Sequence, residues 1–269
     1  MISFIQQLRG WRAQRGFSQL SLSLDAGVSA RHLSFLETGR SQPSREMVLR
    51  LAAALDLPLR ERNELLVGAG FAPRFGERRL NHEEMQEARR AVRLMLSAHE
   101  PCPAFALDRY WNLVEWNRPQ AYLLRELADE DGSLANLNAL DLVFEPTMMR
   151  DQFVNWDEVA RAVLLRLRRQ IKRVGSADER LEALWKRLLA LPSVEPLLRE
   201  VPAAANPPIL VPIKVRAEDR ILTWISTLAV FGATGEVTLD ELVIESFFPG
   251  DDLTREFVMQ SARTAPDRP

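Results

Sequence analysis

The segment from Gln19 to Leu36 constrains the fold of this chain more than any other part of it. Apolar residues recur there at the spacing of two short helices, and Gly27 stands between them. Glycine adopts the left-handed backbone conformation that a tight turn between helices requires. Ser18 and Ser29 precede the two helices as candidate N-caps. The spacing predicts a helix-turn-helix; the alternative is an ordinary pair of packed helices in a helical domain.

Further short helices surround this pair. Residues 2–72 hold glycine and proline turn signals but no strand pattern. Helices are predicted from Ser44 to Leu55 and from Leu59 to about Ala69. We therefore predict an all-α domain of five helices. It ends near a stretch between Gly70 and Leu80 that is rich in glycine, proline and arginine, which is typical of a linker.

Charge is distributed unevenly along the chain of 269 residues, whose formal net charge is −2. Residues 1–80 carry a net charge of +5 and the remainder carries −7, so the first part suits a polyanion. The single cysteine, Cys102, excludes an intrachain disulfide and a cysteine-rich zinc site. No apolar stretch is long enough to span a membrane, and the N-terminus lacks a signal-peptide layout. We expect a cytoplasmic protein that needs no cofactor or metal.

The second half of the chain mixes strand and helix periods. Two strands around a turn are predicted at Ala104–Asp108 and Trp111–Trp116, and an antiparallel meander of three strands at Ile209–Arg216, Ile221–Phe231 and Val237–Phe248. Neither face of the middle strand is clearly polar, which predicts a sheet covered on both sides. One face would meet this domain's own helices, and the other a helix, a second subunit or both. Helices are predicted from Asn81 to Ala98 with a capping box at Glu84, from Asn117 to Ala128, from Asn155 to Val174 and around Leu181–Leu188, and a proline-rich loop from Pro192 to Pro208.

Several short stretches carry a resemblance to known families. Ser18-Gln19, Ala26–Ser29, Leu33–Arg40, Pro43–Glu46 and Gly70–Pro73 resemble the phage-repressor-like, or XRE-type, helix-turn-helix family. Asp108–Val114, Val154–Ala160 and Glu241–Pro249 are similar to the ligand-binding domain of the MmyB-like transcription regulators. The second resemblance implies a PAS-like fold with an apolar cavity able to hold a fatty-acid-like molecule. The first implies a partly buried ion pair between Arg12 and Glu37.

The expected fold class is α plus α/β. An all-α, five-helix repressor-like domain is followed by a PAS-like domain with an antiparallel sheet and flanking helices. We place the helix-turn-helix DNA-binding domain at residues 1–72, the linker at 73–81, the PAS-like ligand-binding and dimerisation domain at 82–262, and a tail at 263–269.

Residues that face DNA follow from their position in the motif. Base edges are expected to meet Ala30, Arg31, Ser34 and Phe35. Arg31 is the strongest candidate, because arginine bridges guanine O6 and N7, whereas Ala30 and Phe35 offer only apolar contact. Phosphates are expected at Ser18, Gln19, His32, Arg40, Ser41, Ser44 and Arg45, most of which lie near helix N-termini. The alternative for the two arginines is solvated charge, and for His32 a partly exposed helix position.

The second domain carries candidate ligand-binding residues. Aromatic and apolar side chains expected to line a cavity are Trp111, Trp116, Phe144, Trp156, Leu164, Leu167, Trp224, Phe231, Ile244 and Phe247. Arg109, Asn112, Asn117 and Arg166 are candidate partners for a carboxylate head. The alternative for each aromatic residue is simple core packing, and for each polar residue a surface or capping role.

These observations predict a sequence-specific DNA-binding transcription regulator that is not an enzyme. One helix-turn-helix reads few base pairs, so we expect a homodimer on a double-stranded operator, with a small apolar effector that changes operator binding. The alternative is a second domain that serves only dimerisation or a protein partner. An enzyme is the rival class. However, the three histidines lack the His-Glu-x-x-His spacing, and neither a dinucleotide loop nor a Walker A sequence occurs.

Overall fold

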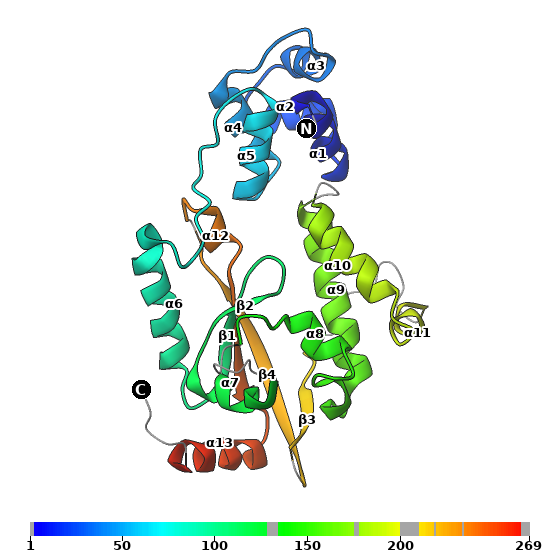
Figure 1. Ribbon diagram of the computed structural model, residues 1–269. Helices are drawn as coiled ribbons and strands as arrows, with labels where there is room; N and C mark the ends of the chain where they lie inside the picture. The colour runs from blue at the N-terminus through cyan, green and yellow to red at the C-terminus, as the bar shows by residue number, and fades with distance from the viewer. Residues whose placement is uncertain are drawn as a thin grey trace. The chain divides into compact units, whose positions relative to one another are not determined.

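A computed structural model of the chain describes residues 3–127, 134–174, 178–199, 210–217, 219–232 and 234–264 (Figure 1). The chain forms two compact units. The first unit comprises Met1–Arg78, Ile171–Asp178 and Ala233–Asp240, and the second comprises Arg79–Gln170, Glu179–Gly232 and Glu241–Pro269.

The helical unit contains the five predicted helices. They are α1 (Phe4–Gln14), α2 (Gln19–Asp25), α3 (Ala30–Thr38), α4 (Arg45–Ala54) and α5 (Leu59–Gly68). Ser18, Ser29 and Ser44 cap α2, α3 and α4 by accepting a backbone N–H from the third residue beyond, which confirms the predicted caps at Ser18 and Ser29. Gly27, with φ of +63°, makes the turn between α2 and α3. The helix-turn-helix geometry thus follows from local sequence signals.

The core of the helical unit is made by the apolar faces of these helices. Leucines at helical spacing are fully buried in it: Leu8, Leu22, Leu33, Leu36, Leu51, Leu65 and Leu66. Leu33 and Leu36 anchor the inner side of α3, so the opposite side of this helix faces outward.

An ion pair joins α1 to α3, as the resemblance to phage repressors implies. Arg12 Nε donates to Glu37 Oε1 at 2.6 Å, and Gln19 Nε2 donates to the other carboxylate oxygen at 2.7 Å. Burial alone would raise the pKa of Glu37. The hydrogen bonds from Arg12 and Gln19 and the charge of Arg12 outweigh burial and lower this pKa from its ordinary value. The Glu37 carboxylate therefore ties three helices together.

The second unit is built on a five-stranded antiparallel sheet. Its strands are β1 (Ala104–Leu107), β2 (Leu113–Trp116), β3 (Ile213–Ala217), β4 (Arg220–Val230) and β5 (Val243–Pro249). They lie in the order β2-β1-β5-β4-β3, which confirms the predicted hairpin and meander. The additional pairing of β5 with β1 joins the hairpin and the meander into one sheet.

Helices flank this sheet on both faces. Around it lie α6 (Gln86–Ala98), α7 (Arg118–Leu123), α8 (Ala139–Phe144), α9 (Trp156–Val174), α10 (Glu179–Leu189), α11 (Val194–Arg199) and α13 (Asp252–Thr264), with 3-10 turns η1 (Glu83–Met85), η2 (Arg125–Leu127) and η3 (Arg150–Gln152). Glu115 of β2 accepts hydrogen bonds from Arg89 and Arg93, which places α6 over one face. The face is covered only in part, since Phe248 is 42% exposed.

Several predicted boundaries are wrong. The third run of the meander begins as the short helix α12 (Val237–Asp240), which shortens β5. His82, not Asn81, caps the start of the first helix of the second unit, because its side chain accepts the Glu84 N–H. The predicted proline-rich loop contains α11, and its residues 200–208 lie outside the described residues, as do Ala128, Ile209, Glu218 and Ala233. Near the end of β4, Leu228 and Val230 are 49% and 66% exposed within this chain, and cover of this end by a second subunit stays a prediction.

Glu37→Gln is expected to lower the free energy of unfolding at neutral pH by about 1–3 kcal/mol, because Arg12 loses its counter-charge. A lowered carboxyl pKa contributes stability that is present above the unfolded value and is lost as the pH falls through the folded value. The difference between variant and wild type should therefore shrink below about pH 4.5. Thermal denaturation followed by circular dichroism measures it. Glu46→Gln, at an exposed site on α4, is the control, and an equal loss in both variants would contradict the assignment.

Candidate nucleic-acid interface and ligand cavity

The outward side of α3 presents the side chains that were predicted to face bases. Arg31 is exposed, and its guanidinium lies over the Phe35 ring at 5.4 Å from the centroid. Ala30, Ser34 and Phe35 are half-buried. Figure 1 shows α3 at the margin of the helical unit. The helix is therefore accessible to a major groove.

The predicted phosphate contacts surround α3 at the starts of two neighbouring helices. Ser18, Ser44, Arg40 and Arg45 are exposed, and His32 and Ser41 are half-buried. The hydroxyls of Ser18 and Ser44 already accept a capping N–H. The amide nitrogen of Gln19 donates to Glu37, so this side chain serves the helix–helix junction. Arg40 and Arg45 supply positive charge beside the N-terminus of α4.

A cavity of about 460 Å³ lies in the second unit. Its floor is one face of the sheet, because side chains alternate along each strand. The floor comprises Phe105, Ile213, Val215, Leu222, Trp224, Glu245 and Phe247. Val215 is paired with Leu222 of β4, and Glu245 is paired with Leu228 of β4. Leu222 and Leu228 are about 20 Å apart at ordinary strand rise. The cavity floor is therefore long.

Helices make the walls of this cavity. Val159, Val163 and Arg166 lie at helical spacing on one side of α9 and line it. Further lining residues come from α7, α8, η3 and α13: Gln120, Leu123, Leu124, Ala139, Leu142, Gln152 and Phe257 are examples. Most of these side chains are apolar, as is usual for a site that holds a small molecule.

Charged and aromatic side chains interact at the Glu245 end of the floor. Arg166 donates to Glu245 at 3.1 Å and lies over the Trp111 ring at 4.4 Å from its centroid. The Trp111 indole N–H donates to Gln170 Oε1 at 2.9 Å. Trp111 has a φ of +69°, a left-handed conformation that costs energy in a residue with a β-carbon. The contacts with α9 hold this residue in place.

Four of the fourteen predicted ligand residues line the cavity: Trp111, Arg166, Trp224 and Phe247. The structure places ten outside its lining: Arg109, Asn112, Trp116, Asn117, Phe144, Trp156, Leu164, Leu167, Phe231 and Ile244. Ile244 faces the opposite side of the sheet from Glu245, and Leu164 and Leu167 lie on another side of α9 from Val163. Phe231 follows the end of β4.

Five of the remaining residues in this group have structural partners. Arg109 is 5% exposed and forms an ion pair with Glu241. Asn112 bonds to Asp108 and Asn138. The Phe144 and Trp156 rings meet edge to face, with centroids 6.2 Å apart. The polar candidates for a carboxylate partner that miss the cavity thus bond to other groups of the protein.

Asn117 is the clearest example of such a structural role. Its Oδ1 accepts the backbone N–H groups of Ala104 and Gln120, and its Nδ2 donates to the carbonyls of Leu96 and Cys102. The residue is 4% exposed and caps α7. It joins α6, β1 and α7 and does not line the cavity.

Sequence reasoning missed most of the lining, Gln120 and Glu245 above all. The alternation of Ile213, Val215 and Ala217 was a usable signal for the β3 part of the floor. The direction in which Gln120 points depends on how α7 packs against β1, and the sequence holds no local signal for this packing.

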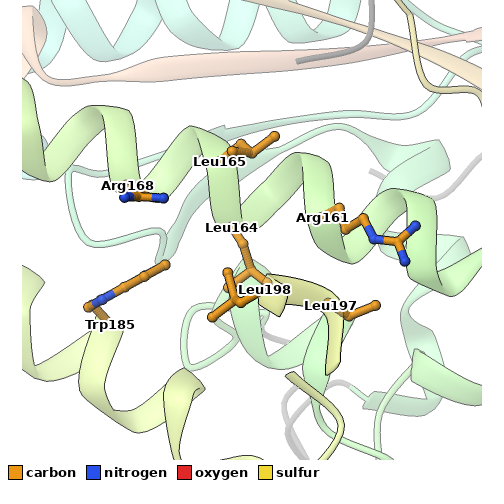
Figure 2. Close-up of a pocket in the computed structure, with 7 residues that line it drawn as sticks. All are labelled: Arg161, Leu164, Leu165, Arg168, Trp185, Leu197 and Leu198. Carbon is orange, nitrogen blue, oxygen red and sulfur yellow. The ribbon is translucent and has the colours of Figure 1, made fainter. Parts of the chain in front are cut away.

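A second, much smaller cavity of about 10 Å³ lies among α9, α10 and α11 (Figure 2). It is lined by Arg161, Leu164, Leu165, Arg168, Trp185, Leu197 and Leu198. Such a space holds about one water molecule, so this void is too small for a ligand. Within the described ranges, no group of three or more His, Cys, Asp or Glu residues is placed to hold a metal ion. None of the described helices is long and apolar enough to cross a membrane.

Comparisons with known proteins agree with this division of the chain. A family model described as "Helix-turn-helix" matches residues 8–62. A second model, "MmyB-like transcription regulator ligand binding domain", matches residues 88–260, more than half of the chain. The two matches define a DNA-binding transcription regulator with a ligand-binding domain. The chain belongs to the MmyB-like transcription regulator family.

Other comparisons add little. No curated protein matches the chain. One solved structure, described as "Structure of an RNA-binding Light-Oxygen-Voltage Receptor", is 11% identical, with a TM-score of 0.26. The alignment covers 98% of this chain and 65% of that one, so this chain spans about two thirds of its length. A likeness at this TM-score supports no functional conclusion.

Asn117→Ala is expected to lower the free energy of unfolding by at least about 2 kcal/mol, because it removes a cap and leaves buried backbone groups without partners. Chemical denaturation measures the change. Asn81→Ala, at the exposed position that does not act as the cap, is the matched control and should stay within about 0.5 kcal/mol of wild type. Equal effects of the two substitutions would refute the structural role of Asn117.

Proposed function

We propose that a small, fatty-acid-like apolar molecule binds in the large cavity and changes the affinity of a homodimer for its operator in the cytoplasm. The observation that carries this proposal is the cavity of about 460 Å³ lined mainly by apolar side chains. Ligand sites of small molecules have volumes of roughly 300–1,000 Å³ and the same apolar character. A sensor needs such a space, whereas a domain that only dimerises does not.

DNA recognition is assigned to α3. Arg31 is the only one of the four base-facing candidates that carries a cationic fork, which can contact guanine O6 and N7 at once. Ser34 can bond to several bases, and Ala30 and Phe35 suit a thymine methyl group. The stacking of Arg31 on Phe35 supports this assignment, because it restrains the arginine without removing its donors.

Phosphate contacts are assigned to the helix starts beside α3. Arg40, Ser41, Ser44 and Arg45 lie around the N-terminus of α4, where unpaired N–H groups and the helix dipole attract an anion. Ser18, Gln19 and His32 complete the proposed set, with Gln19 acting through its backbone because its side chain is engaged by Glu37. These contacts position the protein, and Arg31 reads the sequence.

The dimer is proposed to form through apolar surface of the second unit. On α6, Leu94 is 68% exposed, on the side away from buried Val92 and Leu96, and Met95 is 44% exposed. Phe248 of β5 adds apolar surface at 42% exposure. We assign the interface to these exposed apolar side chains, because a second copy would remove them from water. Two copies would present two α3 helices to two half-sites.

The proposed control is a population shift. A ligand that fits one packing of the second unit better than another changes the populations of the two packings, and hence the spacing of the two α3 helices in the dimer. The exposed α6 surface also favours a second candidate function, in which the second unit dimerises without a small-molecule effector. The two candidates differ in whether ligand changes operator affinity.

Arg31→Ala is expected to weaken binding to the selected operator by about 1–3 kcal/mol and to relax the preference at one base pair. The operator is first obtained by selection from a random DNA pool, and affinity is measured by fluorescence anisotropy at fixed salt. Arg255→Ala removes an equal charge from α13 and should leave the affinity unchanged. An equal loss of affinity for random DNA and operator would show that Arg31 contacts phosphate only.

Saturating ligand is expected to change operator affinity by about 5- to 150-fold, the usual range of allosteric coupling. A long-chain fatty acid and the corresponding primary alcohol are titrated into the dimer with the operator present. Val163→Trp, which fills the cavity, should abolish the response while DNA binding persists. If neither compound changes the affinity at saturation, the effector proposal fails and the dimerisation-only candidate stands.

A further inference from the structure

The connection between β4 and β5 is longer than a hairpin needs. The two strands are neighbours in the sheet and Val230 pairs with Val243, yet the chain between them runs from 231 to 242. Hairpin loops usually have about 2–5 residues. Residues 233–240 of this connection belong to the helical unit, whereas both strands belong to the second unit. The connection therefore links the floor of the cavity covalently to the helical unit.

Backbone and side-chain bonds hold this connection within the helical unit. The backbone N–H of Val237 donates to the carbonyl of Gly76 at 2.7 Å, and Val237 is fully buried. The Glu236 carboxylate accepts the backbone N–H of Arg78 at 2.6 Å and forms an ion pair with its guanidinium at 3.0 Å. A β-carbon at Gly76 would overlap this carboxylate, so a larger residue there would displace the ion pair. The start of α12 is thereby fixed to the segment that follows α5.

Asp240, at the end of α12, supplies a cap that α5 lacks. The residue before α5 is Pro58, whose side chain has no hydrogen-bonding group. The Asp240 carboxylate accepts the backbone N–H of Leu59, the first residue of α5, at 3.4 Å. A carboxylate in this position satisfies an unpaired N–H and interacts favourably with the helix dipole. Leu65 of α5 belongs to the same buried core as Leu36 of α3, so the cap stabilises a helix of the core on which α3 packs.

A row of hydrogen bonds leads from the cavity to the residue beside Asp240. Trp111 lines the cavity, and its indole N–H donates to Gln170. Gln170 donates in turn to the backbone carbonyl of Arg109 at 2.7 Å, and the guanidinium of Arg109 is paired with Glu241. Arg109 is 5% exposed, and an ion pair shielded in this way is costly to break. Glu241 follows Asp240 directly in the chain, so the position of one constrains the position of the other.

We propose that this row of bonded residues from Trp111 to Asp240, the cap relay, lets a molecule in the cavity stabilise the start of α5. The two states are a capped and an uncapped α5. A molecule packed against Trp111 restrains the cap relay, so it favours the state in which Asp240 binds Leu59. The inference rests on the proposed function, because it needs a molecule in the cavity. It adds the route by which occupancy of the cavity reaches the helical unit.

The test follows hydrogen exchange at the start of α5 in the full chain, with and without the neutral apolar fluorophore N-phenyl-1-naphthylamine at saturation. Exchange is measured by mass spectrometry on overlapping peptides that cover α5, and binding is measured by the fluorescence of the probe. The probe is expected to slow exchange there by about fivefold or more, the lower end of the usual range of coupling between sites. Unchanged or faster exchange in protein that binds the probe would overturn the inference and leave the proposed function in place. If the probe does not bind, the proposed function fails and the inference fails with it.

Substitutions at the two ends of the cap relay test its residues. Asp240→Ala is expected to speed exchange at the start of α5 by about fivefold without the probe and to abolish the effect of the probe, which still binds. Asp240→Asn keeps a side-chain oxygen as acceptor and should retain most of the effect. Asp252→Ala removes the same charge from the exposed start of α13 and is the control, which should behave as wild type.

Gln170→Met breaks the cap relay beside the cavity without changing its lining. It is expected to abolish the effect of the probe on α5 and to leave exchange without the probe as in wild type, because Asp240 still caps the helix. Slowed exchange on probe binding in both Asp240→Ala and Gln170→Met, equal to that in wild type, would overturn the inference.

Discussion

The position of β5 between β1 and β4 is the constraint on which the ligand-binding unit depends. Its pairing with β1 places Glu245 opposite Phe105, and its pairing with β4 places Phe247 opposite Ser226. One face of the sheet thereby becomes continuous from the hairpin to β3. The helices above that face do not fill it, and a cavity of about 460 Å³ remains. A space of this size is within the range of small-molecule sites.

Buried polar interactions fix the position of α3 and of the elements around the cavity. In the helical unit, Glu37 receives Arg12 and Gln19, so that α3 is fixed on its inner side and open on its outer side. In the second unit, Asn117 joins α6, β1 and α7, while Arg109 is paired with Glu241. These strongly hydrogen-bonded side chains therefore have a structural role. Arg31, which we propose to contact bases, lies outside this set and is exposed.

The sequence predicts the helices and strands of this fold better than it predicts which of their side chains line the cavity. Ser18, Ser29 and Gly27 are local signals, and they locate the helix-turn-helix correctly. Runs of strand-forming residues locate the meander, since this signal is local to each strand. The pairing of β5 with β1 joins residues far apart in the chain, and no local pattern encodes it. For the same reason ten of the fourteen predicted cavity residues lie outside its lining.

Binding of a neutral apolar fluorophore tests most directly whether the space above the sheet is a ligand site. N-phenyl-1-naphthylamine needs no knowledge of the natural effector, and Val163→Trp occupies part of the same volume. We expect one saturable site per chain in the wild-type protein and its loss in the variant, with the same circular dichroism spectrum for both. Absence of saturable binding to the wild-type protein, or equal binding to Val163→Trp, would contradict the assignment of this cavity as the sensor.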